Sequence, residues 1–331
     1  MDLSTSYLGI KLPHPFIAGA SPLSEKVDSA RRVEDGGAAA IVMHSLFEEQ
    51  LHAEALATHF STETHADFVA EATSFFADHE DFAVGPDEYL EQIRKIKEAV
   101  NIPVIASLNG FTQGGWLDHS VAIEQAGADA LELTLYYVAT DANESGESIE
   151  QRDVDMVSQV RKETKIPLAL KLSPFYTSLG NFARRLEKAG ADGFVLFNRY
   201  YEADIDTEEL MVRSHLKLST SSELQLRLRW LAILSGQVKS SLAVGGGVHT
   251  VSDAVKAVMA GADAIQMVSA ILQDGPDHIS KVRKELADWL EKKEYESLKQ
   301  MKGSMNILSC PDPKALARAN YMYVLQTFEM E

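Results

Sequence analysis

The sequence contains a single cysteine, Cys310, among its 331 residues. One cysteine excludes an internal disulfide and a Cys-rich metal cluster, and it suits a reducing compartment. Long apolar runs are also absent: none approaches the roughly 20 residues that span a bilayer, and residues 1–10 lack the basic and apolar regions of a signal peptide. Positive charge is scarce, since 31 Lys and Arg face 49 Asp and Glu for a net charge of -18. This balance argues against a nucleic-acid or anionic membrane surface, so we expect a cytoplasmic protein that acts on small molecules.

What the chain does contain is a strand, a glycine turn, a helix and a second strand in succession over residues 241–272. Three consecutive glycines follow the first apolar run, and a Ser-Ala pair follows the second. Glycines after a strand let backbone N–H groups approach an anion, and the serine adds a hydroxyl. In an eight-stranded barrel, a phosphate site commonly follows strands seven and eight. The residues expected to form such a site are Gly246, Gly247, Ser269 and Ala270.

Six further apolar strands precede this stretch, which brings the expected count to eight. Three Ala-Gly-Ala-Asp segments, beginning at Ala126, Ala189 and Ala260, each end an amphipathic helix and start a strand. This repeated βα unit and the late phosphate site predict an α/β protein with a single (β/α)8 TIM barrel over residues 1–331. A doubly wound open sheet uses the same joints and remains the alternative. The expected strands are residues 16–20, 39–43, 102–108, 130–135, 166–172, 193–197, 241–245 and 264–268.

Three segments lie outside the eight units. Residues 1–15 are expected to form an N-terminal hairpin beneath the barrel, and residues 46–86 form a long insertion after strand two that covers the active site. Because the histidines of this insertion have neither HExxH spacing nor a Cys/His cluster, we predict no metal site. Residues 303–331 form a C-terminal extension with an amphipathic helix, which either caps the barrel or contacts a second subunit. The histidines of the insertion are His52, His59, His65 and His79.

Polar residues follow most of the apolar strands, at the end of a barrel where active sites lie. The most informative is Lys171 within the run LALKLSP, because an inward ammonium needs an anionic or electron-rich partner. The alternative for this lysine is a structural ion pair with Glu132 on a neighbouring strand. Asn109 and Asn198 each follow an apolar run directly, where an amide can bind the edge of a heterocycle. The remaining candidates at strand ends are Ala20, Ser21, His44, Thr134 and Tyr137.

The order of these motifs resembles that of the dihydroorotate dehydrogenases, specifically their soluble branch. The resemblance is carried over residues 3–303 by LALKLSP, VLFN, AVGGGV with QMVSA, and VGPDEYLEQI. It implies FMN as cofactor, hydride transfer between dihydroorotate or a similar small planar substrate and flavin N5, a place in pyrimidine biosynthesis, and a homodimer. By this resemblance, Lys171 faces the pyrimidine edge of the flavin and stabilises negative charge on its reduced form. The FMN-binding residues that it implies are Ala20, Ser21, Asn109, Lys171, Asn198, Gly246, Gly247, Ser269 and Ala270.

The substrate half of the site departs from the pattern of that family. The family's fourth strand ends in a catalytic cysteine or serine among asparagines, whereas here the aligned text is Thr-Leu-Tyr-Tyr-Val-Ala. Tyr137 takes the position of the base, and a phenol of ordinary pKa about 10 is a poor base near neutral pH but an adequate proton donor. The other interpretation of Tyr137 is a loop aromatic that covers the barrel mouth. His44 stands where the family has a lysine, and with Thr134 and Asn198 it completes the expected substrate contacts.

Three functions follow as hypotheses. The first is an FMN-dependent oxidoreductase acting on CH–CH bonds, with dihydroorotate as default substrate and another small planar carbonyl compound or heterocycle as competitor. The second is a non-redox barrel enzyme, such as a phosphosugar isomerase or aldolase, in which Lys171 forms a Schiff base. The third is a flavin-binding protein without catalysis. We favour the first, with Tyr137 and Lys171 as its catalytic residues.

Overall fold

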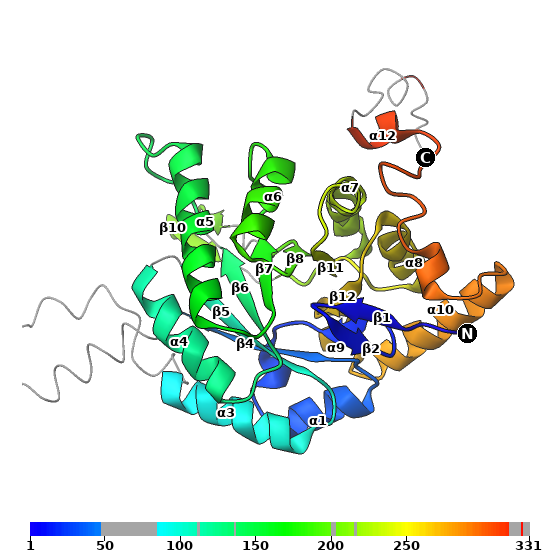
Figure 1. The fold of residues 1–331 in the computed structure, drawn as a ribbon, viewed down its shortest axis with the longest axis horizontal. Helices are drawn as coiled ribbons and strands as arrows, with labels where there is room; N and C mark the ends of the chain where they lie inside the picture. The colour runs from blue at the N-terminus through cyan, green and yellow to red at the C-terminus, as the bar shows by residue number, and fades with distance from the viewer. Residues whose placement is uncertain are drawn as a thin grey trace, which may run out of the picture.

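The computed structural model describes residues 1–47, 85–110, 113–135, 137–199, 203–214, 217–317 and 326. Eight parallel strands form a closed barrel whose neighbours run in chain order, which confirms the expected (β/α)8 TIM barrel and excludes a doubly wound open sheet. Helices surround the barrel, as Figure 1 shows. The barrel strands are β3 (Phe16–Ala18), β4 (Ile41–Phe47), β5 (Val104–Gly110), β6 (Ala130–Leu135), β7 (Leu168–Leu172), β8 (Gly193–Leu196), β11 (Ser241–Gly245) and β12 (Ala264–Met267).

The helices pack their apolar faces on the outside of the barrel. The start of the helix that follows β11 is fixed by a capping box: the Thr250 side chain accepts from the N–H of Asp253, whose carboxylate in turn accepts from the N–H of Thr250. The helices are α1 (Val27–Asp35), α3 (Pro86–Ala99), α4 (Gln113–Gln125), α5 (Gly146–Glu163), α6 (Leu179–Ala189), α7 (Leu224–Leu234), α8 (Val251–Ala260), α9 (Ser269–Asp274), α10 (His278–Lys292), α11 (Leu298–Met301) and α12 (Pro313–Ala317), with 3-10 turns η1 (Pro22–Ser24) and η3 (Ser221–Glu223).

The Ala-Gly-Ala-Asp repeats join helices to strands as the sequence predicts. In the second repeat, Gly190 ends α6 with a φ of 115°, a conformation that glycine adopts without strain. The aspartate of each repeat then accepts a hydrogen bond from a backbone N–H near the start of an adjacent strand. These bonds run from Val104 N to Asp129 (2.7 Å), from Leu168 N to Asp192 (2.9 Å) and from Leu242 N to Asp263 (2.9 Å). The repeat therefore fixes where neighbouring strands begin.

Two hydrophobic clusters divide the core. One fills the space between barrel and helices, and the other lies inside the barrel, where alanines and a few larger side chains alternate with the outward residues. The hairpin expected over residues 1–15 is present as β1 (Thr5–Tyr7) and β2 (Ile10–Leu12), which pair antiparallel. It closes the N-terminal end: the Thr5 hydroxyl donates to Asp263 O at 2.9 Å, and buried Tyr7 joins the inner cluster. The opposite end is left for the site.

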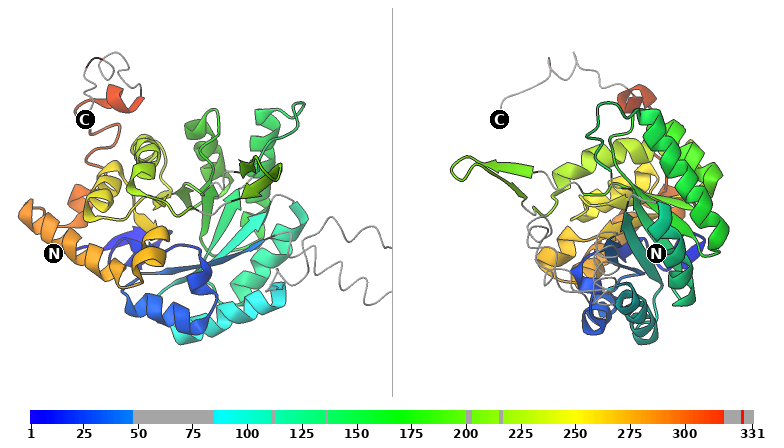
Figure 2. Two further views of the ribbon diagram at one scale, coloured as in Figure 1. Left: turned by 180° about the vertical axis from the view of Figure 1, so that it is seen from behind. Right: turned by 90° about the vertical axis from the view of Figure 1, so that its left-hand side faces the viewer.

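A second hairpin, which the sequence analysis did not foresee, follows β8. Strands β9 (Ala203–Asp206) and β10 (Met211–Ser214) pair antiparallel, and Figure 2 shows them projecting beyond the barrel on the side away from β1 and β2. Ile205 and Val212 are cross-strand partners, 69% and 70% exposed, so one face of this hairpin is apolar.

The expected insertion and tail lie mostly outside the described residues. Of residues 46–86, only the two at each end are described, and His52, His59, His65 and His79 all fall outside. Of the C-terminal extension, α12 is described, and the tail beyond residue 317 is not, apart from residue 326. Within the described part of the chain, no helix is long and apolar enough to cross a membrane.

Candidate functional site

Three of the predicted site residues form a row across β5, β6 and β7. Asn109 pairs in register with Thr134, and Thr134 pairs with Lys171. All three face the barrel interior, because Ile105, Ala130 and Ala169, at the same alternation on these strands, belong to the inner cluster. An amide, a hydroxyl and an ammonium therefore share one layer near the carboxyl ends of the strands, where barrel active sites lie.

Lys171 makes the ion pair that the sequence analysis gave as the alternative. Its Nζ lies 3.3 Å from Glu132 Oε1, and the two side chains are 12% and 1% exposed. Glu132 also accepts a hydrogen bond from Gln266 Nε2 of β12. An ammonium has three N–H donors, so the pair with Glu132 leaves Lys171 with donors for a ligand. The contact with Glu132 is therefore compatible with a structural ion pair, because it balances the buried carboxylate. It is equally compatible with a ligand-binding role, because it holds a cation in place inside the barrel.

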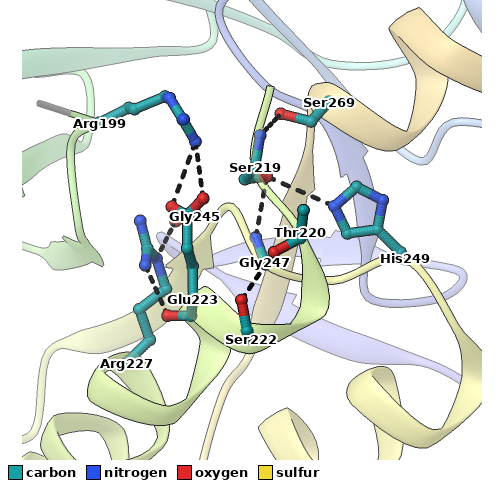
Figure 3. A network of polar contacts seen from close by, with 10 residues as sticks. All are labelled: Arg199, Ser219, Thr220, Ser222, Glu223, Arg227, Gly245, Gly247, His249 and Ser269. Carbon is teal, nitrogen blue, oxygen red and sulfur yellow. Dashed lines mark hydrogen bonds and ion pairs between the residues drawn. The ribbon is translucent and has the colours of Figure 1, made fainter. Parts of the chain in front are cut away.

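The residues predicted to bind phosphate come together at the ends of β11 and β12. Gly246 and Gly247 both have a φ of 80°, and the backbone N–H of Gly247 donates to Ser219 Oγ at 3.2 Å. The N–H of Ser219 in turn donates to Ser269 Oγ at 2.9 Å, and His249 Nε2 lies 3.4 Å from Ser219 Oγ (Figure 3). Ala270 follows Ser269 in α9. The two turns are thus one site, and Ser219 links them.

Sequence reasoning missed a charged cluster beside these turns. Arg199 Nη1 lies 3.1 Å from both carboxylate oxygens of Glu223, while Arg227 donates from Nε to Gly245 O and from Nη1 to Glu223 O at 2.7 Å. Arg227 is only 7% exposed. A signal for it was present: Leu224, Arg227 and Leu231 recur at helical spacing, so the arginine occupies a core-facing position of α7.

A cavity of about 850 Å³ opens beside this cluster. It lies between the loop after β7, the end of β8 and the start of α7, and its volume is within the usual range for a small-molecule site. The backbone N–H of Asn198 donates to Leu172 O at 2.9 Å, which continues the pairing of β7 and β8 to the cavity wall. The polar residues that line it include Asn198, Arg199, Lys217, Thr220, Ser222 and Arg227.

Two predicted residues near β3 and β4 have unsatisfied polar atoms. Ser21 is 7% exposed, and within the described residues its Oγ has no hydrogen-bond partner. Neither ring nitrogen of His44 has such a partner, and burial lowers the pKa of this histidine. A register shift in β4 places Ser45 next to Ser107, with 2.8 Å between their hydroxyls, whereas the His44 ring packs edge-on against Tyr89. Ala20 lies between β3 and Ser21.

Tyr137 follows β6 and belongs to a polar group on the loop before α5. Its hydroxyl donates to Glu144 Oε2 at 2.7 Å, and the Arg152 guanidinium lies 4.4 Å from the centre of its ring. Arg152 also bonds Glu144 Oε1 at 2.8 Å. The hydrogen bond to Glu144 raises the pKa of Tyr137, with burial adding to the effect. Tyr136 is outside the described residues, and the described part of the chain has no group of three or more His, Cys, Asp or Glu side chains that could hold a metal.

Comparison with known proteins identifies the family to which this barrel is related. A family model described as dihydroorotate dehydrogenase matches residues 3–290. The chain is 27% identical over 307 residues to the catalytic subunit of dihydroorotate dehydrogenase B (NAD(+)) from Thermoplasma volcanium, with 91% of this chain and 98% of that protein covered. It is 24% identical over 327 residues to the NAD-dependent dihydropyrimidine dehydrogenase subunit PreA of Escherichia coli K12, with 92% and 77% covered.

Proposed function

The chain belongs to the dihydroorotate dehydrogenase family, and from that premise we propose that it is an FMN-dependent oxidoreductase acting on a small planar substrate. Dihydroorotate is the default substrate, and a related heterocycle or carbonyl compound with an activated carbon–carbon bond is its competitor. The observation that carries this proposal is the layer of Asn109, Thr134 and Lys171 in the same barrel mouth as the paired turns at Gly247 and Ser269.

The described residues fit FMN on three counts. Gly246 and Gly247 form a turn with positive φ, as expected where backbone N–H groups meet a phosphate. The unsatisfied hydroxyl of Ser21 calls for a polar partner that the described residues do not provide. Lys171 supplies a cation for an electron-rich ring. These residues, with Ala20, Asn109, Asn198, Ser269 and Ala270, are the ones we propose to hold the cofactor.

A bound flavin supplies the hydride chemistry at its N5 atom. The part of this chain is to position the substrate and to move the accompanying proton. Thr134 and Asn198 offer a hydroxyl and an amide for the substrate's polar edge, and His44 remains a predicted contact. The hydrogen bond to Glu144 raises the pKa of Tyr137, so the phenol holds its proton near neutral pH and is available as a proton donor but not as a base. The proposal therefore favours reduction of an activated double bond.

The contact of Lys171 with Glu132 argues against the non-redox alternative. Schiff-base formation requires a neutral amine, whereas an ammonium paired at 3.3 Å with a buried carboxylate is a poor nucleophile. Family membership points the same way. The flavin-binding protein without catalysis remains an outcome of the test below. The homodimer and the cytoplasmic location stay predictions from the sequence.

The function is tested by reconstituting the protein with FMN and mixing it anaerobically with dihydroorotate while visible flavin absorbance is followed. We expect bleaching in the presence of substrate, and reoxidation of the photoreduced protein by orotate. A protein that binds FMN but exchanges electrons with neither compound has another substrate or no catalysis. Failure of the folded protein to bind FMN contradicts the proposal itself.

Replacing Tyr137 by phenylalanine is expected to slow reoxidation of the reduced protein by its substrate about 100-fold, a typical loss for a missing general acid. FMN affinity should not change. Glu144→Gln keeps the hydroxyl but removes the carboxylate that raises the pKa of Tyr137. A reaction that needs the protonated phenol falls as pH rises through this pKa, so the basic limb of the pH–rate profile should move to lower pH in Glu144→Gln. Unchanged rates and profiles in both variants would assign Tyr137 to covering the barrel mouth.

A further inference from the structure

Arg227 places a buried cation directly behind the glycine turn. The residue is 7% exposed, and two of its guanidinium nitrogens donate to main-chain carbonyls, Gly245 O at the end of β11 and Glu223 O at the start of α7. Both acceptors are neutral. These bonds satisfy the geometry of the guanidinium but do not neutralise its charge.

The nearby carboxylate is already paired with another cation. Both carboxylate oxygens of Glu223 lie 3.1 Å from Arg199 Nη1, and among the described residues Arg227 makes no ion pair (Figure 3). Burial lowers the pKa of Arg227, but a guanidinium does not lose its proton in proteins, so the positive charge persists. The Glu223 carboxylate also favours the charged form of Arg227, so two guanidinium groups share one carboxylate. A bound anion would balance the remaining buried positive charge.

The position of this charge identifies the anion. Arg227 Nε donates to Gly245 O, and a Cβ built on Gly246 would lie 3.4 Å from Arg227 Nη2, so the guanidinium lies beside the turn that we assign to phosphate. Arg227 also lines the cavity of about 850 Å³, whose lining residues do not include Gly246 or Gly247. Arg227 therefore borders both the glycine turn and the cavity.

We propose that Arg227 supplies the fixed positive charge that binds the ligand's phosphate and makes this site select FMN over riboflavin. The inference rests on the proposed function, because it assigns the glycine turn to a flavin phosphate. Hydrogen bonds and contacts that involve a charged partner are worth more than neutral ones, and their loss typically lowers affinity about 10- to 100-fold. The selectivity follows because riboflavin has the same ring and ribityl chain without the phosphate.

The test measures FMN and riboflavin affinity by flavin fluorescence in the wild type and in Arg227→Met, Arg227→Lys and Arg229→Met. Arg229 is an exposed arginine of the same helix and is the matched control. We expect Arg227→Met to bind FMN about 10- to 100-fold more weakly and riboflavin as before, with Arg227→Lys between the two and Arg229→Met unchanged. Inorganic phosphate should compete with FMN in the wild type but much less in Arg227→Met.

The test distinguishes a failure of the inference about Arg227 from a failure of the proposed function. Equal losses for FMN and riboflavin would show that Arg227 only ties β11 to α7, and this would overturn the inference while leaving the proposed function intact. A wild type that binds both flavins equally would do the same. A wild type that binds neither flavin overturns the inference and the proposed function together. If Arg227→Met does not fold, Arg227→Lys decides: loss of affinity for both flavins contradicts the inference, and loss for FMN alone supports it.

Discussion

Lys171→Met is expected to slow flavin reduction by dihydroorotate about 100- to 1,000-fold, the usual loss when one preorganised electrostatic contact is removed. The reason is that the ammonium faces the barrel interior in the layer of Asn109 and Thr134, held 3.3 Å from Glu132. A cation fixed there would stabilise negative charge on a bound flavin as it is reduced, which is the role proposed for Lys171. Anaerobic stopped-flow absorbance of the reconstituted variant measures this rate.

The same substitution should also destabilise the fold. Removing Lys171 leaves the carboxylate of Glu132, whose side chain is 1% exposed, without its cation, and breaking a buried pair in this way costs about 3–5 kcal/mol. The double variant Lys171→Met with Glu132→Gln removes both charges, so we expect urea unfolding to show most of the stability restored. Flavin reduction should stay slow in the double variant. Wild-type reduction rates in either variant would limit Lys171 to a structural ion pair.

The sequence was sufficient to predict the barrel because helix ends and strand starts are encoded locally. Each Ala-Gly-Ala-Asp segment contains both a glycine that ends a helix and an aspartate that binds the start of the preceding barrel strand, so each segment marks one joint between βα units. The positions of the two turns were predictable for the same reason, since Gly246 and Gly247 follow β11 and Ser269 lies two residues beyond the end of β12. Their assignment to phosphate is the proposal made above. Local signals of this kind need no knowledge of distant contacts.

What could not be predicted depends on contacts between distant segments. The hydrogen bond between Ser219 and Ser269 joins residues 50 positions apart. In the sequence, the loop that contains Ser219 is only a run of serine and threonine, which does not indicate its partner. The register shift in β4 brings Ser45 rather than His44 beside Ser107. The order of apolar and polar residues along this strand does not reveal such a shift. The short hairpin of β9 and β10 alternates charged and apolar residues over too few positions to stand out from a loop.

Gly247→Ala is expected to destabilise the protein by about 3–4 kcal/mol and to abolish tight FMN binding, whereas Gly246→Ala should cost only about 1–2 kcal/mol. Both glycines have a φ of 80°, so both alanines carry the same left-handed strain. They differ in what the new Cβ meets. At Gly247 it would lie 2.8 Å from Leu224 N and 3.0 Å from Leu224 Cα, the backbone that begins α7.

This difference makes the pair of variants a test of the turn itself. The backbone at the start of α7 can make room for the new Cβ only if the helix moves. That movement would break the hydrogen bond from the Gly247 N–H to Ser219 and disturb the turn that we assign to phosphate. At Gly246 the nearest atom is Arg227 Nη2 at 3.4 Å, an ordinary contact with a side chain. Urea unfolding and FMN titration of the two variants measure both effects. Equal losses of stability would mean that backbone strain, rather than the close approach of α7, determines why glycine is required at Gly247.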